Sequence, residues 1–334
     1  MRIAIATDAW TPQVNGVVRT LHQTAETLES FGHEVKVLHP GMFKTVPCPT
    51  YPSIPLALLP GAGIGEALRG FAPDAVHVAT EGPIGHAARR WCIRRSKPFT
   101  TSFHTQFPEY IRARAPLPIS WSYAYIRRFH HAAVRTLVPT QTQVKRLADR
   151  RFEHLVLWSR GVDTAVFKPY GRGALALPGP ILMYMGRVAV EKNIEAFLSL
   201  KTPASQVVVG DSPDRHKLQS AFPHAHFLGA KFGADLARHV AAADVFVFPS
   251  RTDTFGLVLL EALACGVPVA AYPVTGPIDV IDNGVTGVLD ADLDTAVRGA
   301  LKLDRKVCAQ AAQAYSWARC TRQFESYLEF APMH

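Results

Sequence analysis

The sequence has few cysteines, no long apolar run and no leader-like start. Its five cysteines include no C-x-x-C pair, which argues against a disulfide framework or a zinc site, so we expect five free thiols. The most apolar stretch, 257–274, is interrupted by Glu261 and two prolines and falls short of the roughly 20 residues of a membrane span. The first residues suit a strand better than a signal peptide. We therefore expect a cytoplasmic protein whose membrane contact is peripheral.

Negative charge is scarce in the first half of the chain. Residues 1–165 hold 20 Lys and Arg against 11 Asp and Glu, whereas residues 166–334 hold 16 of each. A nucleotide pocket alone needs only two or three cations. The one-sided excess therefore suggests an anionic partner, such as a membrane leaflet, nucleic acid or an acidic acceptor.

Short apolar runs alternate with helical segments along the 334 residues, as in parallel sheets covered on both faces. The alternation restarts at residue 181, after a stretch rich in proline and glycine. The sequence therefore predicts an α/β chain of two doubly wound, Rossmann-like domains. We expect a first domain over 1–167, a linker over 168–180, a second domain over 181–315 and a closing helical segment, 316–334, that could return across the join.

Open parallel sheets bind ligands at the carboxyl ends of their strands, and the loop after the predicted strand 245–248 carries Asp253. Glu261 follows eight positions later, inside an apolar helix. A carboxylate there is costly unless donors hydrogen-bond it, and a ribose diol would supply two. The alternative is an acid on the solvent side of that helix. The amides of Gly256 and Leu257, at its start, could bind phosphate.

These residues belong to a set of ordered motifs. With Gly186-Arg187-x4-Lys192 upstream and His104-Thr-x-Phe-Pro-Glu109-Tyr110 earlier still, the chain resembles the retaining glycosyltransferases of family four, which have the GT-B fold. The resemblance runs over nearly the whole chain. It implies two Rossmann-like domains facing a central cleft, and transfer of a hexose from a nucleotide-sugar to an acceptor hydroxyl with retained configuration. It implies no metal and no other cofactor.

The resemblance also assigns the donor site. It gives the diphosphate to Arg187 and Lys192, the sugar hydroxyls to the loop of Asp253, and the ribose to Glu261. Two fixed cations suit a leaving diphosphate that gains negative charge, although an exposed, salt-bridged helix start would look the same in sequence. The implied donor-binding residues are Gly16, Arg160, Gly186, Arg187, Lys192, Asp253, Thr254, Phe255, Gly256, Leu257 and Glu261. For Arg160, an ion pair at a domain hinge is the alternative.

The family signature is a Glu, seven residues and a second Glu, and here Asp253 takes the first place. We expect this shorter acid to affect which hexose epimer fits. By resemblance His104 contacts the transferred sugar, so the catalytic set is His104, Arg187, Lys192 and Asp253. On the acceptor side we expect Asn15, Glu81, Gln106, Glu109 and Tyr110, with a plain surface acid as the alternative for Glu109.

Cations interleave with aromatic residues in two segments of the first half, a composition that suits an anionic membrane surface, although a solvated helix face is the alternative. No nucleic-acid motif accompanies the charge. The stretch resembles the lipid-glycosylating branch of the family, including sulfoquinovosyl and diacylglycerol glucosyl transferases. We therefore expect a lipid or glycan acceptor, a UDP-hexose donor and a place on the inner face of the cytoplasmic membrane.

Three other functions remain open: a GDP-mannose-dependent α-mannosyltransferase, a nucleotide-sugar 2-epimerase and a catalytically inactive sugar-nucleotide sensor. One further pattern, Asp290-Ala-Asp292-Leu-Asp294, looks like a metal-binding Asp-x-Asp. Because it precedes a helical pattern late in the chain, we interpret it as a turn and an N-cap.

Overall fold

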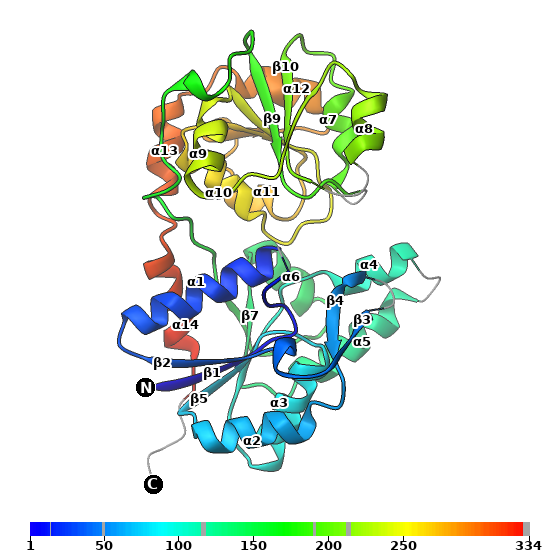
Figure 1. The fold of residues 1–334 in the computed structure, drawn as a ribbon, viewed down its shortest axis with the longest axis vertical. Coiled ribbons are helices and arrows are strands. Elements are labelled where there is room, and N and C mark those ends of the chain that lie inside the picture. Colours follow the sequence, from blue (N-terminus) through cyan, green and yellow to red (C-terminus); the bar gives the residue numbers. More distant parts are fainter. Residues whose placement is uncertain (14, 49–50, 115–117, 190–191, 212–214, 330–334) are drawn as a thin grey trace. The chain divides into compact units, whose positions relative to one another are not determined.

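The structure is a computed structural model (Figure 1). It describes residues 1–334 except 14, 49–50, 115–117, 190–191, 212–214 and 330–334, and the side chains of 51–53, 110–111 and 113–114 also lie outside the description. The chain forms two compact units, one of residues 1–159 with 317–334 and one of residues 160–316.

The first unit is built on a parallel six-stranded sheet in the order β2-β1-β5-β6-β7-β8. The strands are β1 (Arg2–Ala6), β2 (Glu34–Leu38), β5 (Ala75–Val78), β6 (Thr100–Ser102), β7 (Arg135–Val138) and β8 (Leu155–Leu157). A short antiparallel pair, β3 (Thr45–Cys48) and β4 (Tyr51–Ala57), stands apart from this sheet.

Helices cover both faces of this sheet, because successive side chains of each strand point to opposite sides. Ile3 and Ile5 of β1 belong to one apolar cluster and Ala4 and Ala6 to another. The first cluster involves α1 and α14, and the second involves α2 and α3. The helices of this unit are α1 (Gly16–Ser30), α2 (Gly61–Phe71), α3 (Pro83–Arg94), α4 (Phe107–Arg114), α5 (Ile119–His130), α6 (Gln141–Ala148) and α14 (Trp317–Tyr327).

The second unit repeats the plan with a parallel sheet in the order β11-β10-β9-β12-β13-β14. Its strands are β9 (Ile181–Met185), β10 (Ser205–Val209), β11 (His226–Gly229), β12 (Val245–Phe248), β13 (Val269–Ala271) and β14 (Gly287–Leu289). Its helices are α7 (Ile194–Leu198), α8 (Arg215–Ala221), α9 (Gly233–Ala242), α10 (Leu257–Ala264), α11 (Pro277–Val280), α12 (Leu293–Ala300) and α13 (Arg305–Ala312).

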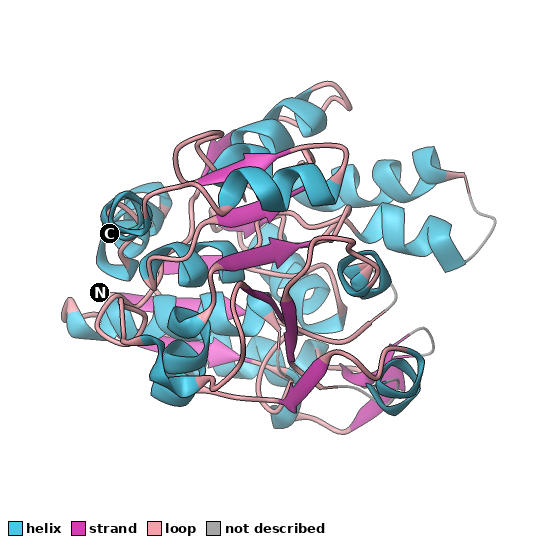
Figure 2. Cartoon of the chain, turned by 90° about the horizontal axis from the view of Figure 1, so that it is seen from above, coloured by secondary structure: helices cyan, strands magenta, loops and turns pink. Residues whose placement is uncertain are grey.

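The second sheet is likewise covered by helices on both faces. Met183 and Phe246 pack in the cluster that contains α9 and α10, whereas Leu182 and Val245 pack in the cluster that contains α7 and α12. Figure 2 shows strands lying between helices, as the alternating apolar runs predict. The α/β fold of two doubly wound, parallel-sheet domains is therefore confirmed.

Packing contacts show to which unit the residues near the two boundaries belong. Val162 and Phe167 already belong to the core of the second unit, so the stretch 168–180 lies inside that unit. Helix α14 returns to the first unit, where the Phe324 ring lies 4.9 Å from the Trp158 ring.

Two expectations from composition concern cysteines and membrane spans. All five cysteines lie in the described part of the chain, and no disulfide joins any of them. Among the described residues, no helix has both the length and the apolar character that a bilayer crossing requires.

Candidate functional site

Each sheet contains one point at which its connections change direction. In the second unit, β9 and β12 are neighbours, but the chain leaves β9 toward β10 and leaves β12 toward β13 on the opposite side. In the first unit, β1 and β5 stand in the same relation. Ligands of open α/β sheets bind at the carboxyl ends of the strands beside such a switch point. The loops after these four strands are therefore the candidate site loops.

The loops after β9 and β12 are joined by an ion pair. Lys192 Nζ lies 2.6 Å from Asp253 Oδ1 and 2.8 Å from Oδ2, with each side chain about one-fifth exposed. Beside this pair, Asn193 donates from Nδ2 to the Pro249 carbonyl at 3.0 Å. The structure thus brings together the two residues that the sequence assigned to the diphosphate and to the sugar.

The start of the β9 loop depends on two glycines. Gly186 has a φ of 147°, and a Cβ on Gly210 would lie 1.8 Å from the Gly186 carbonyl oxygen, so no larger residue fits there. The Tyr184 hydroxyl donates to the Arg187 carbonyl at 2.7 Å. Arg187 is held through its backbone in this way, while its side chain is exposed.

The β12 loop leads into α10, where Glu261 is only 2 % exposed. Gly256 precedes this helix with a φ of 83°, and Phe255 is buried. The turn at Gly276 closes over the loop, since a Cβ there would lie 2.9 Å from the Phe255 carbonyl oxygen. The interpretation of Glu261 as an acid on the solvent side is therefore wrong, because α10 buries that face.

In the first unit, the predicted residues Asn15 and Gly16 begin α1. Asn15 Oδ1 accepts hydrogen bonds from the amides of Val17 and Val18, both at 3.0 Å. Asn15 therefore has a capping role that its assignment to the acceptor did not foresee.

Sequence reasoning missed Asp8, which lies just after β1 and is buried. Its carboxylate accepts from the Thr80 hydroxyl at 2.8 Å and from the amides of Ile84 and Gly85 at 2.9 and 3.2 Å. Burial raises the pKa of Asp8, and these hydrogen bonds oppose the rise. A Cβ on Gly82 would lie 2.4 Å from the Asp8 carboxyl carbon, so a glycine is needed there. The signal for Asp8 was its place directly after the first strand.

Glu81 follows β5 and meets a histidine that the sequence did not single out. Its Oε1 lies 3.2 Å from His130 Nε2, and the two side chains are 8 % and 2 % exposed. His130 Nδ1 lies 2.9 Å from the Thr101 hydroxyl. The buried pair places one carboxylate oxygen at the carboxyl end of β5 in a defined position.

His104 follows β6 and is nearly buried, with its ring 5.8 Å from the Trp158 ring. Further along the loop, Gln106 Oε1 accepts from Arg146 Nη1 at 3.2 Å. Glu109 Oε1 accepts from Arg146 Nη2 at 3.1 Å. One arginine thus ties together two predicted acceptor residues, while the side chain of the third, Tyr110, lies outside the described residues.

The same carboxylate of Glu109 accepts from the Tyr123 hydroxyl at 2.6 Å. Burial and this hydrogen bond raise the pKa of Tyr123. Arg146 and Tyr123 were both missed as site residues, because each reaches Glu109 from a different helix. Arg160, assigned to the donor by resemblance, is buried at the start of the second unit.

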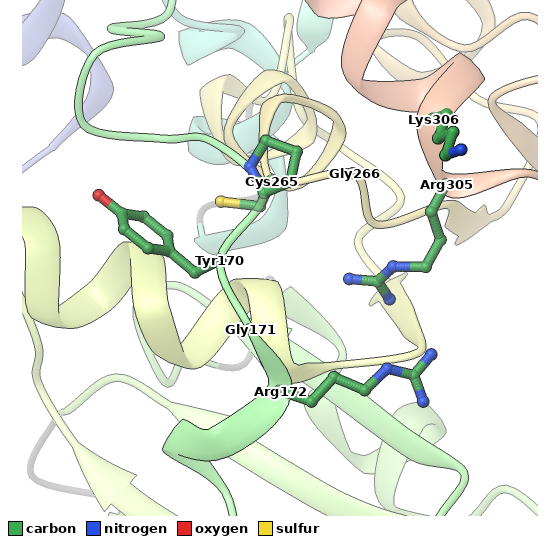
Figure 3. Close-up of a pocket in the computed structure, with 8 residues that line it drawn as sticks. Tyr170, Gly171, Arg172, Cys265, Gly266, Arg305 and Lys306 are labelled. Carbon is green, nitrogen blue, oxygen red and sulfur yellow. The ribbon is translucent and has the colours of Figure 1, made fainter.

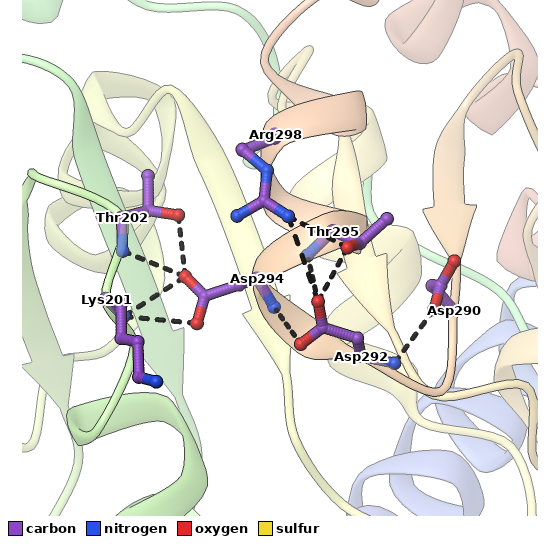
Figure 4. A network of polar contacts seen from close by, with 7 residues as sticks. All are labelled: Lys201, Thr202, Asp290, Asp292, Asp294, Thr295 and Arg298. Atoms are coloured by element: carbon purple, nitrogen blue, oxygen red, sulfur yellow. Dashed lines mark hydrogen bonds and ion pairs between the residues drawn. The ribbon is translucent and has the colours of Figure 1, made fainter.

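The Asp-x-Asp pattern forms a capping network (Figure 4). Asp292 accepts from the amides of Asp294 and Thr295 and begins α12, and the Thr295 hydroxyl hydrogen bond lowers the pKa of Asp292. Asp294 accepts from the amides of Lys201 and Thr202. The interpretation as a turn and N-cap is confirmed.

A cavity of about 180 Å³ lies at the C-terminal end of α10. Figure 3 shows the residues that line it. Two cations that line it have structural partners. Arg305 donates to the carbonyls of Ala241 and Ala243, at the end of α9, and Arg172 pairs with Asp244 at 2.8 Å. This cavity takes no part in the candidate site.

Comparison with known proteins places both units in known families. The family described as glycosyltransferase family 4 matches residues 14–166, and the family described as glycosyl transferases group 1 matches residues 179–303. Among solved structures, sucrose-phosphate synthase from Thermosynechococcus elongatus superposes with a TM-score of 0.76 at 20 % identity, over 97 % of each chain. This likeness supports the GT-B fold.

Three relatives extend the comparison. A GDP-mannose-dependent alpha-mannosyltransferase from Mycobacterium tuberculosis is 34 % identical, over 86 % of this chain and 83 % of that protein. A sulfoquinovosyl transferase from Arabidopsis thaliana is 31 % identical over 85 % of this chain and 62 % of its own length. An alpha-monoglucosyldiacylglycerol synthase from Streptococcus pneumoniae is 27 % identical over 90 % and 78 %. The resemblance read from the motifs is confirmed, and the chain belongs to the family four, or group 1, glycosyltransferases.

Proposed function

We propose that this glycosyltransferase moves a hexose from a nucleotide-sugar to an acceptor hydroxyl with retained anomeric configuration and without a metal ion. The observation that carries the proposal is the Lys192–Asp253 pair at the switch point of the second sheet. It places a cation and a carboxylate side by side, which suits a donor that presents a phosphate next to sugar hydroxyls.

The proposed roles of these residues are charge stabilisation and hydrogen bonding. As the glycosidic bond breaks, the leaving diphosphate gains negative charge, and Lys192 with Arg187 would stabilise it. An ammonium group has three donors, so Lys192 can bind a phosphate oxygen while it keeps Asp253 in place. The acceptor hydroxyl would attack on the face that the diphosphate leaves, and a diphosphate oxygen would take its proton. Glu261 would accept hydrogen bonds from the ribose.

The first unit would supply the acceptor side. His104 would contact the transferred sugar, and Gly16 would lie by the diphosphate. Glu81 and the Arg146-bound pair Gln106 and Glu109 present oxygen atoms that could accept from an acceptor hydroxyl. These roles rest on the family resemblance, and the hydrogen bonds supply the fixed positions that they require.

For the donor, GDP-mannose is the first candidate, because the protein from Mycobacterium tuberculosis described above is named for it and matches most of this chain. UDP-hexose, which the motifs favoured, is the second, because the relatives also include the glucosyldiacylglycerol synthase. Asp253 in place of the family Glu is the sequence feature that we expect to affect the choice.

For the acceptor, we propose a membrane lipid, approached by an enzyme bound peripherally to the inner, anionic face of the cytoplasmic membrane. Helix α5 exposes Trp121 by 70 % and Tyr125 by 56 %. Arg128 is exposed on the same helix, and Arg90 and Arg94 are exposed on α3. The two helices touch, since His86 Nε2 lies 2.6 Å from the Tyr125 hydroxyl. Aromatic and cationic side chains together suit such a surface.

The test is thermal stabilisation of the purified chain by UDP, GDP, ADP and their sugars, with a chelator in place of added metal. A ligand at 100 times its dissociation constant stabilises a protein by about 2.7 kcal/mol. We expect a shift with one base, followed by transfer to a lipid extract that yields an α-linked product from an α-linked donor. Inversion of configuration, or turnover that stops with the chelator, would contradict the mechanism.

The same assay separates the two rival functions. A 2-epimerase would convert the donor without any acceptor, and an inactive sensor would bind the nucleotide-sugar without consuming it. Transfer that requires an acceptor hydroxyl excludes both.

A further inference from the structure

The first unit contains a cavity of about 340 Å³ that the proposed transfer does not use. It lies between α5 and the turn that follows α6. Among the described residues that line it, three are arginines and one, Asp149, is a carboxylate, and their neighbours include Ser120 and Tyr123. The arginines are Arg127, Arg150 and Arg151. The described lining residues therefore carry a net charge of +2, three arginines less one aspartate, which favours an anion.

Backbone carbonyls, and not carboxylates, hold two of these arginines in place. Arg127 Nη1 donates to the Arg150 carbonyl at 3.0 Å, and Arg150 Nη1 donates to the Arg146 carbonyl at 3.1 Å. The guanidinium carbon of Arg150 lies 4.3 Å from the centre of the Tyr123 ring. Such fixed side chains lose little conformational freedom when a ligand binds.

Their positive charge is not neutralised by a neighbour. Within the ranges that the structure describes, Arg127, Arg150 and Arg151 make no ion pair with a carboxylate, whereas the adjacent Arg146 pairs with Glu109. Each guanidinium keeps donors that a carbonyl does not use. Planar guanidinium forks match the oxygens of phosphate, and charge-assisted bonds of this kind are about twice as strong as neutral ones.

The geometry points to a binding site for a phosphate ester in this cavity, held by Arg127, Arg150 and Arg151. The volume exceeds that of a bare phosphate ion and accommodates a small polar substituent beside Ser120 and Tyr123. The site goes beyond the proposed transfer reaction. Its ligand has two sources of the same chemistry, a free phosphate ester or the phosphodiester of a lipid headgroup.

The site is connected to the loop after β6. Tyr123, which borders the cavity, donates to Glu109 at 2.6 Å. Arg146 accepts from Arg150 through its carbonyl and donates through its side chain to Gln106 and Glu109. Tyr123 therefore lies between the cavity and Glu109, so a single side chain would separate a bound phosphate ester from the candidate acceptor residues. We expect binding there to change the position of that loop.

The first arm of the test measures binding of glycerol 3-phosphate to the full chain by calorimetry, without any donor, with glycerol as the uncharged control. Arg127→Gln and Arg151→Gln should each weaken binding at least tenfold. Lys145→Gln, the matched control at an exposed position on α6, removes the same charge outside the cavity and should bind like the wild type. Since the Arg151 side chain makes no hydrogen bond or ion pair with the described residues, Arg151→Gln separates lost binding from lost folding.

The second arm measures cosedimentation with phosphatidylcholine vesicles that contain phosphatidylglycerol. Binding of glycerol 3-phosphate that depends on Arg127 and Arg151 indicates a free ester as the ligand. Vesicle binding with the same dependence, but no binding of the soluble ester, indicates the lipid headgroup. The proposal is overturned if neither probe binds, or if Lys145→Gln weakens binding as much as Arg127→Gln and Arg151→Gln. Nucleotide binding is measured on the same samples, so that a failure of the cavity proposal can be distinguished from a failure of the donor site.

Discussion

Lys192 Nζ contacts both carboxylate oxygens of Asp253, at 2.6 and 2.8 Å, so one ion pair links the loops after the two strands at the switch point. The pair is only partly exposed, which limits screening by solvent and salt. Any ligand that enters between these loops meets the cation and the carboxylate together.

Lys192→Ala should lower turnover by about 100-fold or more, because it removes a cation from the developing diphosphate charge. Lys201→Ala, an exposed lysine of the same unit, is the matched control and should keep normal turnover. Initial rates with saturating acceptor measure the effect, and circular dichroism checks the fold. Normal rates in Lys192→Ala would remove Lys192 from the site.

Asp253→Glu should change the choice of hexose, because one added methylene moves the carboxylate against the sugar hydroxyls while it keeps the charge beside Lys192. We expect the ratio of kcat/KM for mannose and glucose donors to shift by about tenfold, the size of effect that one methylene produces in a binding pocket. Asp253→Asn should instead lower turnover with every donor. An unchanged ratio in Asp253→Glu would mean that Asp253 does not contact the sugar.

Glu261→Gln should weaken nucleotide binding by about 10- to 100-fold, because hydrogen bonds to a charged group are worth about 1.5–3 kcal/mol. The effect should disappear with a nucleoside diphosphate that lacks the ribose hydroxyls, which isolates the pair in the manner of a double-mutant cycle. Glu195→Gln, an exposed acid of α7, serves as the control. A loss that persists with the deoxygenated nucleotide would point to a structural role for Glu261.

Asp8 predicts a pH dependence of stability. Because burial raises its pKa in the folded state, its contribution is complete below the ordinary value of 3.8 and is lost as the pH rises through the raised pKa. In urea unfolding between pH 4 and 8, the advantage of the wild type over Asp8→Asn should therefore fall with increasing pH. Glu29→Gln, at an exposed site on α1, should show no such trend. A rising advantage would mean that the hydrogen bonds outweigh burial.

Much of the candidate site in the second unit could be predicted from the sequence, because its residues lie in short loops with local spacing. Glycines and an apolar strand precede Lys192, and Asp253 follows the next strand of the switch point. The first unit was harder, because its contacts join residues far apart in the chain. Asp8 binds amides 76 and 77 residues away, and Glu81 meets His130 49 residues later. Periodicity carries no information about such pairs.

The spacing of residues in the sequence also concealed the capping role of Asn15. Asn15 looked like a ligand contact because it precedes a glycine in a strand-to-helix loop, yet the same position is where a helix takes its N-cap. The two interpretations require the same residue types, and the hydrogen bonds to Val17 and Val18 establish the capping role.

The return of α14 fixes the order in which the protein can mature on the ribosome. Ile3 and Ile5 emerge long before Cys320, Phe324 and Leu328, which belong to the same apolar cluster. The second unit, by contrast, is continuous in sequence and is complete once residue 316 has emerged. The first unit must therefore wait with an unfinished apolar face until α14 has emerged, and a chain that stalls before residue 317 releases one finished unit and one unfinished one.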